Sequence, residues 1–141
     1  MPDSLYQQAI LRHAKAAVGA GRLDNATVEA TVDNPLCGDR VTVSLALDDG
    51  TIAAIGHEVR GCVLCQAAAS VLAQHGVGLS AEEVHAIDAA FQAMIRDGGP
   101  VPDGWPDLAT FEPVRAAKSR HECVLLPFEA ATRALDAAEA R

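Results

Sequence analysis

Aromatic residues are scarce in this sequence. They make up 4% of its 141 residues, although hydrophobic residues as a whole make up 50%. The core must therefore be built mainly from alanine, valine and leucine, and a chain of this length corresponds to one domain, residues 1–141. A core of this size does not require a metal ion or disulfides in order to fold.

Long apolar segments are missing as well. No stretch approaches the roughly 18 to 20 consecutive apolar residues that a membrane-spanning helix needs. The first residues, Met1–Ser4, also lack the basic start and apolar middle of a secretion signal. We therefore expect a cytoplasmic protein that has no membrane partner.

Basic residues are few and dispersed. There are 11 lysines and arginines against 19 acidic residues, which gives a net charge of −8. Binding to a nucleic-acid backbone needs clustered basic side chains that displace counterions. The composition thus argues against a nucleic-acid partner, while solubility accounts for most of the acidic charge.

Cysteine occurs at four positions, and only Cys62 and Cys65 form a C-x-x-C pair. Cysteines in a cytoplasmic protein more often bind metals or undergo redox chemistry than form structural disulfides. A zinc ribbon would need two such pairs. A thioredoxin-type site would need a β-α-β unit, whereas three strand-like segments precede Cys62 with no crossover helix. Both of these site types are therefore disfavoured.

Two segments, residues 26–33 and 40–47, alternate between apolar and polar residues, as half-buried strands do. Residues 51–60 are expected to form a third strand. Asp48-Asp49-Gly50 predicts a hairpin turn between the last two segments. Pro35 and Gly38 break the chain between the first two. Two successive hairpins predict a small antiparallel meander, with residues 34–39 as a loop at one end.

Helical spacing of apolar residues, together with helix start and stop signals, predicts helices around this meander. The expected helices span residues 4–19, 62–74, 80–96 and 122–141. Ser80 and Glu83 have the spacing of a capping box, and the glycine- and proline-rich segment 97–106 is expected to be a loop. The fold class predicted from these patterns is α+β.

The loop over residues 34–39 places a thiol, Cys37, two residues from a carboxylate, Asp39. Because the chain then reverses twice, Cys62 returns to the same end of the meander. Cys62 also opens a helix, where unpaired backbone N–H groups favour the thiolate. Cys123 lies at another element boundary that the fold could bring to the same point. Thiolates with one carboxylate suit a thiophilic metal that can also be released.

These motifs resemble the IscU/SufU/NifU N-terminal family of iron–sulfur cluster assembly scaffolds over nearly the whole chain. The resemblance is carried by Asn-Pro-Leu-Cys-Gly-Asp at 34–39 and by Gly61-Cys62 with the small-residue helix after it. It is also carried by the segment 114–120 and by Cys123, which leads the last helix. The order and spacing of these pieces make the similarity specific.

The resemblance implies a site of four ligands, namely Cys37, Asp39, Cys62 and Cys123. The implied occupant is either Zn²⁺ or a labile iron–sulfur cluster. The implied fold is a three-stranded antiparallel sheet covered on one side by helices, in agreement with the meander. The implied partners are a cysteine desulfurase, which delivers persulfide sulfur, and downstream cluster-assembly or acceptor proteins.

The family has two types that differ near the last cysteine. In the IscU type a histidine immediately precedes that cysteine, whereas here Glu122 does and His121 is one position further back. The interval between Cys62 and Cys123 is also longer than in the IscU type, with an insertion around residues 97–106 and the Trp105-x-x-Leu108 motif after it. These features resemble the SufU type, which holds zinc and accepts persulfide sulfur by ligand exchange. The implied acceptor is Cys37 in the SufU type and Cys123 in the IscU type.

Other residues have more than one interpretation. We expect Cys65 to be a core thiol or a bystander near the site, and Asp39 could simply cap its own turn. His121 could reach the site. Arg115 and Arg120 are either surface charges or, as the resemblance suggests, one of them positions or neutralises the thiolates. Three other histidines match no ligand spacing and are expected at the surface, namely His57, His75 and His85.

Three functions therefore stand as hypotheses. The first is a scaffold for iron–sulfur cluster assembly that receives sulfur at the four-ligand site. The second is a zinc-dependent sulfurtransferase that relays sulfur without holding a cluster. The third is an interaction protein with structural zinc, which the large hydrophobic fraction disfavours. Whether the protein is an enzyme stays open between the first two.

Overall fold

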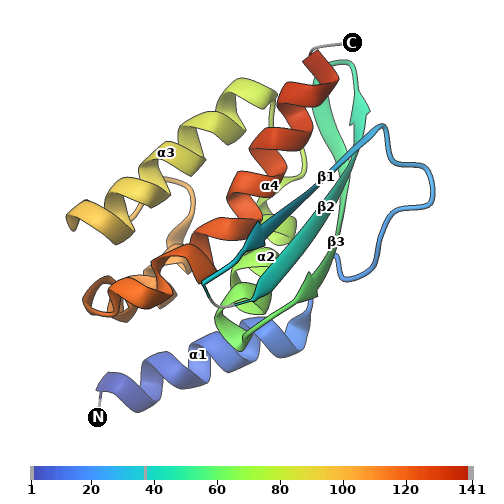
Figure 1. The fold of residues 1–141 in the computed structure, drawn as a ribbon. Coiled ribbons are helices and arrows are strands. Elements are labelled where there is room, and N and C mark those ends of the chain that lie inside the picture. The colour runs from blue at the N-terminus through green and yellow to red at the C-terminus, as the bar shows by residue number, and fades with distance from the viewer. Residues whose placement is uncertain (1, 37, 140–141) are drawn as a thin grey trace.

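The computed structural model describes residues 2–36 and 38–139, and it describes only the backbone of residues 2–7. Its helices lie on one face of a single sheet (Figure 1). The elements in chain order are α1 (Pro2–Ala16), β1 (Val28–Asn34), β2 (Asp39–Asp48), β3 (Thr51–Arg60), α2 (Val63–Gly76), α3 (Ala81–Asp97), the 3-10 helices η1 (Pro106–Ala116) and η2 (Lys118–Arg120), and α4 (His121–Glu139).

The sheet has three antiparallel strands in the order β1-β2-β3, so the predicted meander is confirmed. Strand β3 has the predicted bounds, and β1 and β2 differ from prediction by one or two residues at their ends. The β1–β2 ladder closes on the pair Asn34 and Asp39. The loop between these strands is consequently short, and it lies at the end of the sheet from which β3 leads into α2.

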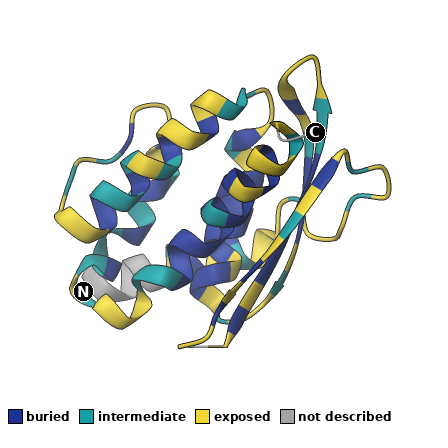
Figure 2. Ribbon diagram, turned by 45° about the horizontal axis from the view of Figure 1, so that its top comes forward, coloured by how far each residue is buried: buried dark blue, intermediate teal, exposed yellow. Residues whose placement is uncertain are grey.

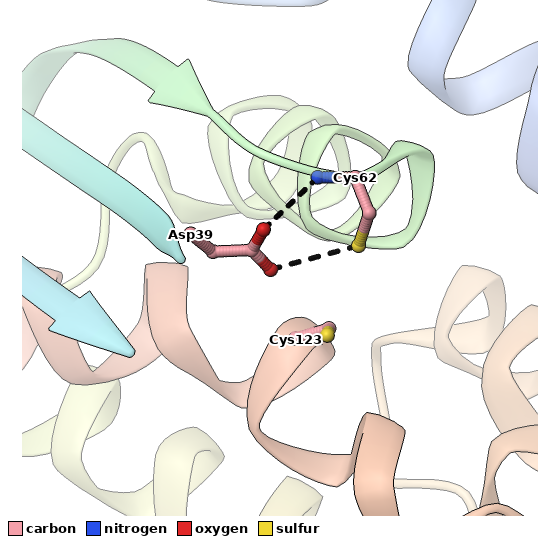
Figure 3. Close-up of side chains that lie close together, drawn as sticks. All are labelled: Asp39, Cys62 and Cys123. Carbon is pink, nitrogen blue, oxygen red and sulfur yellow. Dashed lines mark hydrogen bonds between the residues drawn. The ribbon is translucent and has the colours of Figure 1, made fainter. Parts of the chain in front are cut away.

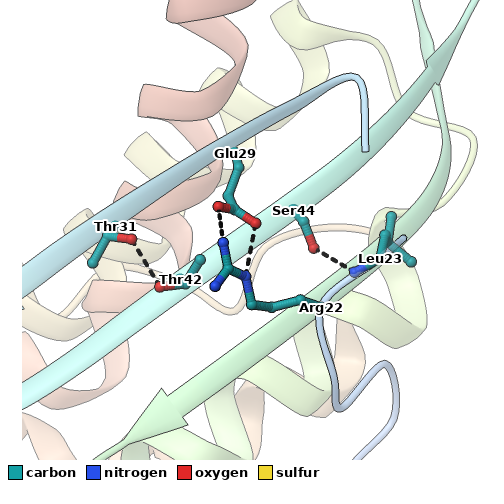
Figure 4. Close-up of polar contacts among 6 residues, drawn as sticks. All are labelled: Arg22, Leu23, Glu29, Thr31, Thr42 and Ser44. Atoms are coloured by element: carbon teal, nitrogen blue, oxygen red, sulfur yellow. Dashed lines mark hydrogen bonds and ion pairs between the residues drawn. The ribbon is translucent and has the colours of Figure 1, made fainter. Parts of the chain in front are cut away.

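The two faces of the sheet differ in polarity because side chains alternate along each strand. Val41, Val43 and Leu45 are fully buried under the helices. The opposite face is polar, and the segment after α1 runs along it (Figure 4). Across this face the hydroxyl groups of Thr31 and Thr42 lie 2.8 Å apart. The segment after α1 is held there by a hydrogen bond from the Leu23 amide to Ser44 Oγ at 3.0 Å and by the ion pair between Arg22 and Glu29.

Small residues allow the helices to approach one another closely. Helix α2 carries Ala67, Ala68 and Ala69, all fully buried, and it packs between α1 and α4. The three phenylalanines and the tryptophan gather where α3, η1 and α4 meet, and the Phe91 ring lies 4.9 Å from that of Phe128. Figure 2 shows that the inward faces of the helices are buried and the outward faces exposed. The result is a single α+β domain with one core.

Helix α1 ends earlier than predicted, and the segment after it covers the edge of β3. Ala17 and Gly19 adopt positive φ values of 46° and 77°, which end the helix. The His57 amide then donates to Gly19 O at 3.0 Å, and the Gly21 amide donates to His57 O at 2.7 Å. These bonds pair the edge strand with the loop instead of leaving it open.

His57 is buried at 5% exposure, so its predicted surface position is wrong. The loop that covers the edge of β3 also covers this side chain, and Nε2 lies 2.7 Å from Val18 O. Burial lowers the pKa of His57 because the charged ring would lose its hydration, and the bond to Val18 opposes this only in part.

The segment after the predicted loop 97–106 forms η1, which the sequence did not indicate. His75 packs on this segment and is half-buried, so its predicted surface position is wrong as well. Its ring lies 5.4 Å from the Trp105 ring, and Nε2 lies 2.7 Å from Asp107 Oδ2. His85 is exposed, as predicted. None of the helices in the described part of the chain is both long and apolar enough to cross a membrane.

Candidate metal centre

The ends of three elements converge at one point (Figure 3). Asp39 is the first residue of β2, Cys62 caps the N-terminus of α2, and Cys123 lies in the first turn of α4. One oxygen and two sulfur atoms of these side chains all lie within 4.8 Å of one another. Among the described residues, no other group of three His, Cys, Asp or Glu side chains meets this distance.

The Asp39 carboxylate is held in place by the residue that it faces. Asp39 is 3% exposed, and its Oδ1 accepts a hydrogen bond from the Cys62 amide at 3.1 Å. Its Oδ2 lies 3.6 Å from Cys62 Sγ, and the thiol donates to it. A carboxylate at the N-terminus of α2 is also favoured by the helix dipole. The Cys62 amide therefore holds the Asp39 carboxylate beside the sulfur atoms of Cys62 and Cys123.

Among the described residues, hydrogen bonds to Asn34 close the turn that precedes β2. The Gly38 amide donates to Asn34 O at 2.8 Å, and the Leu36 amide donates to Asn34 Oδ1 at 3.1 Å. Gly38 has φ +75°, a conformation that side chains rarely adopt. The described hydrogen bonds to the Asp39 carboxylate, by contrast, both come from Cys62 at the start of α2.

Gly61 makes room for that carboxylate. A Cβ atom at position 61 would lie 2.4 Å from Asp39 Oδ1 and 2.6 Å from Asp39 Cγ. Contacts of this kind are far inside van der Waals distance, so any larger residue would displace the carboxylate. The glycine before Cys62 is therefore required by the position of Asp39 on the neighbouring strand.

A cavity of about 540 Å³ opens onto the group, and its lining is Leu36, Asp39, Cys62, Ser119, Arg120 and Cys123. Cys123 is 1% exposed, whereas Cys62 is partly exposed, so the cavity reaches the cysteines from one side. Leu36 is 92% exposed at the rim. The sequence reasoning did not single out Leu36, although an apolar residue in a short Pro/Gly loop has little chance of being buried.

Cys37, predicted as the fourth ligand, lies outside the described residues. Its neighbours Leu36 and Gly38 are described, and Leu36 lines the cavity. The structure therefore brings together Asp39, Cys62 and Cys123 from the predicted set. The place of Cys37 among them stays a prediction.

Two further candidates are engaged elsewhere. His121 Nε2 lies 3.0 Å from Arg115 O, and His121 is not part of the metal-ligand group. Arg115 itself donates to Met94 O at 3.0 Å and to Gly99 O at 2.7 Å, so it caps the C-terminal end of α3. Of the two arginines considered from the sequence, only Arg120 lines the cavity.

Cys65 is fully buried in the first turn of α2, as expected of a core thiol. It is not a member of the group formed by Asp39, Cys62 and Cys123. The C-x-x-C pair thus has one sulfur at the cavity and the other in the interior.

Comparison with known proteins gives a consistent family. Residues 5–112 match the NifU-like N terminal domain. The chain is 28% identical over 131 residues to the iron-sulfur cluster assembly scaffold protein IscU of Thermotoga maritima, covering 93% of this chain and 92% of that protein. It is 29% identical over 131 residues to the zinc-dependent sulfurtransferase SufU of Bacillus subtilis, covering 91% and 87%.

A solved structure agrees with this assignment. The crystal structure of a nitrogen-fixing NifU-like protein (N-terminal) from Brucella abortus superposes with a TM-score of 0.93 at 38% identity, covering 99% of this chain and 97% of that chain. The similarity extends through α4 and so includes Cys123, which lies beyond the range of the family match.

Proposed function

This chain belongs to the NifU-like N-terminal domain family of iron–sulfur cluster assembly scaffolds, and on that premise we propose that it accepts persulfide sulfur from a cysteine desulfurase. The proposed site consists of Cys37, Asp39, Cys62 and Cys123. The observation that carries this proposal is the convergence of an aspartate oxygen and two cysteine sulfurs within 4.8 Å at a cavity.

The donor set fits a thiophilic metal. Zinc sites in proteins have four ligands in tetrahedral arrangement, and Cys37 would complete that number with Asp39, Cys62 and Cys123. When bound, zinc would hold the cysteines as thiolates, and a labile iron–sulfur cluster would use the same ligands. A carboxylate is a weaker ligand than a thiolate for such a metal. Asp39 therefore gives the site a contact that can be exchanged.

Sulfur transfer at this site requires a nucleophilic thiolate and access for a donor. We assign the acceptor role to Cys37, with Cys123 as the alternative. The acceptor thiolate attacks the outer sulfur of the desulfurase persulfide, and the sulfur–sulfur bond of the donor breaks. The donor cysteine leaves as a thiolate, and the acceptor now carries the persulfide. Arg120 lines the cavity, and its positive charge would favour an anionic persulfide held there.

A second candidate is a zinc-dependent sulfurtransferase that relays sulfur without holding a cluster. It is supported by the similarity to the Bacillus subtilis SufU protein and by the residue before Cys123. In place of the histidine typical of the IscU type, Glu122 precedes Cys123 and forms an ion pair with Arg96. His121, one position earlier, is hydrogen-bonded through Nε2 to Arg115 O. The IscU relative is equally similar in identity, so the choice between the two activities depends on experiment.

The test is transfer of sulfur from ³⁵S-cysteine by a cysteine desulfurase, followed by mass spectrometry of the alkylated protein. We expect label on the wild type, loss of label in Cys37→Ser, and retention in Cys65→Ser as a matched control. No labelling of the wild type would overturn the proposal. Labelling of Cys37→Ser equal to wild type would exclude Cys37 as the acceptor. Anaerobic addition of iron then separates the two activities, because only a scaffold develops a cluster chromophore.

A further inference from the structure

The C-x-x-C pair is only half used by the proposed function, because Cys62 belongs to the metal group and Cys65 does not. We propose that Cys65 is the resolving thiol of Cys62. Under a peroxide oxidant the two form a reversible disulfide, which removes Cys62 from Asp39 and Cys123 and opens the metal site. This role goes beyond sulfur acceptance and makes the site responsive to oxidants.

The positions of the two cysteines on α2 bring their side chains within reach. Cys62 is the N-cap, its carbonyl accepts the first helical bond from the Gln66 amide at 3.1 Å, and Cys65 is the third residue of the helix. N-cap and N3 side chains are neighbours in a helix, which is the basis of the capping box.

Helix α3 shows the same relation within this protein. Ser80 is its N-cap and Glu83 its third residue. The Glu83 amide donates to Ser80 Oγ at 3.2 Å, and the Ser80 amide donates to Glu83 Oε1 at 3.0 Å. The two side chains thus lie over the same helix turn. On α2 the N-cap side chain forms no such capping bond, so the Cys62 sulfur is not tied to the helix amides.

Differences in exposure assign separate roles to the two sulfurs. Cys62 is partly exposed and lines the cavity, so a small oxidant reaches it from solvent. Cys65 is fully buried and reacts only with a group that the protein brings to it. Oxidation therefore begins at Cys62, and Cys65 takes the second step within the molecule.

The chemistry balances with hydrogen peroxide as the oxidant. The Cys62 sulfur attacks one peroxide oxygen, the O–O bond breaks, and a sulfenic acid and water result. The Cys65 sulfur then attacks the Cys62 sulfur, the S–O bond breaks, and a second water leaves with the Cys65 proton. Both thiols are oxidised by one electron each, and one peroxide molecule is reduced to two of water.

The disulfide and the metal group compete for one sulfur atom. Cys62 Sγ now lies 3.6 Å from Asp39 Oδ2, on the side that faces Cys123 (Figure 3). A Cys62 sulfur that is bonded to Cys65 is no longer a thiolate, so it cannot serve as a metal ligand in that state. Metal release therefore accompanies the disulfide, and a thiol reductant restores both the free Cys62 and the site.

The experiment treats zinc-loaded wild type and Cys65→Ala with hydrogen peroxide. Zinc release is followed with a chromogenic chelator, and disulfides are mapped by digestion under non-reducing conditions. For wild type we expect a peptide holding residues 62 and 65 with a mass loss of about 2 Da, and restored zinc binding after dithiothreitol. For Cys65→Ala we expect Cys62 to reach the sulfinic acid, which dithiothreitol does not reverse.

The mapping of wild type alone decides the proposal, even if Cys65→Ala fails to fold. A Cys62–Cys65 bond supports it, whereas a bond between Cys62 and Cys123, or no bond at Cys62, overturns it. Equal recovery of Cys65→Ala and wild type also overturns it. The metal readout rests on the proposed function, but the disulfide does not. A wild type that binds no zinc would therefore refute the metal site while the mapping still tested Cys65.

Discussion

Gly61→Ala isolates the contribution of the Asp39 carboxylate to the site. The added Cβ would lie 2.4 Å from Asp39 Oδ1, and ordinary contact begins near 3.4 Å, so the carboxylate must move by about 1 Å. Gly61 does not have a positive φ, so alanine fits its backbone. The substitution thus acts on the position of Asp39 and leaves its chemistry unchanged.

The displacement also weakens the bond from the Cys62 amide to Asp39 Oδ1, now 3.1 Å. Loss of groups that orient a ligand typically weakens metal binding by about 10- to 100-fold. This corresponds to about 1.4 to 2.7 kcal/mol of binding free energy. We expect a weakening of this size in the zinc affinity of Gly61→Ala.

The assay is competition for zinc against a chelator of known affinity, with thermal unfolding as a check on the fold. The control is a double-mutant cycle with Asp39→Ala. If Gly61→Ala acts through the carboxylate, it changes affinity little once that carboxylate is absent, because the new methyl group occupies the vacated space. Unchanged affinity in the single variant, or additive losses in the double variant, would refute the steric argument.

Three further outcomes are expected. Arg115→Ala removes the hydrogen bonds to Met94 O and Gly99 O, so it should lower the free energy of unfolding by about 1 to 3 kcal/mol and leave the zinc affinity unchanged. A loss of zinc affinity at unchanged stability would contradict this. Asp88→Asn should raise the stability at pH 7, because burial raises the pKa of this carboxyl above 3.8 and its Oδ1 has no hydrogen-bond partner among the described residues. Denaturant unfolding should show this gain vanish below pH 3.8, where the carboxyl is protonated in both states. Burial lowers the pKa of His57 below 6.5, so in the metal-free protein the free energy of unfolding should fall as the pH drops below 6.5. His57→Gln should reduce this fall, as measured by urea titrations at pH 7.5 and 5.5, and an equal fall in the variant would contradict the assignment.

The sheet was predictable because local rules determine it. Alternation along residues 40–47 and the Asp-Asp-Gly turn after them indicate the β2–β3 hairpin without reference to the rest of the chain. Helix α3 was predictable for the same reason, since Ser80 and Glu83 form the capping box that their spacing indicated. Elements of this kind carry their own start and stop signals.

The elements that the sequence did not reveal depend on distant contacts. The buried residues of the 3-10 helix η1 are Leu108, Phe111 and Val114, and they pack against the rest of the core. They recur at every third position, which is the period of a 3-10 helix and not the 3.6-residue period of an α-helix. His57 is buried because a loop from near position 20 pairs with the edge of β3, and nothing near position 57 signals that loop. Local patterns cannot show such partners.

The candidate site lies between these two cases. The motifs predicted Asp39, Cys62 and Cys123 as ligands, and the fold brings one oxygen and two sulfur atoms of these side chains within 4.8 Å of one another. The reason for Gly61 became visible only once the neighbouring strand placed a carboxylate against it. In the same way, the sequence left Arg115 and Arg120 equivalent, and their different surroundings separate a structural role from a place at the cavity.

The metal content of anaerobically purified protein tests the central claim most directly. Wild type should be measured beside Cys62→Ser and Cys123→Ser, with Arg133→Ala, an exposed residue on α4, as control. We predict about one zinc ion per chain, or iron with inorganic sulfide, in wild type and control, and loss or clear weakening of binding in both cysteine variants. Equal metal content in all four proteins, or none in wild type, would contradict a metal site at Asp39, Cys62 and Cys123.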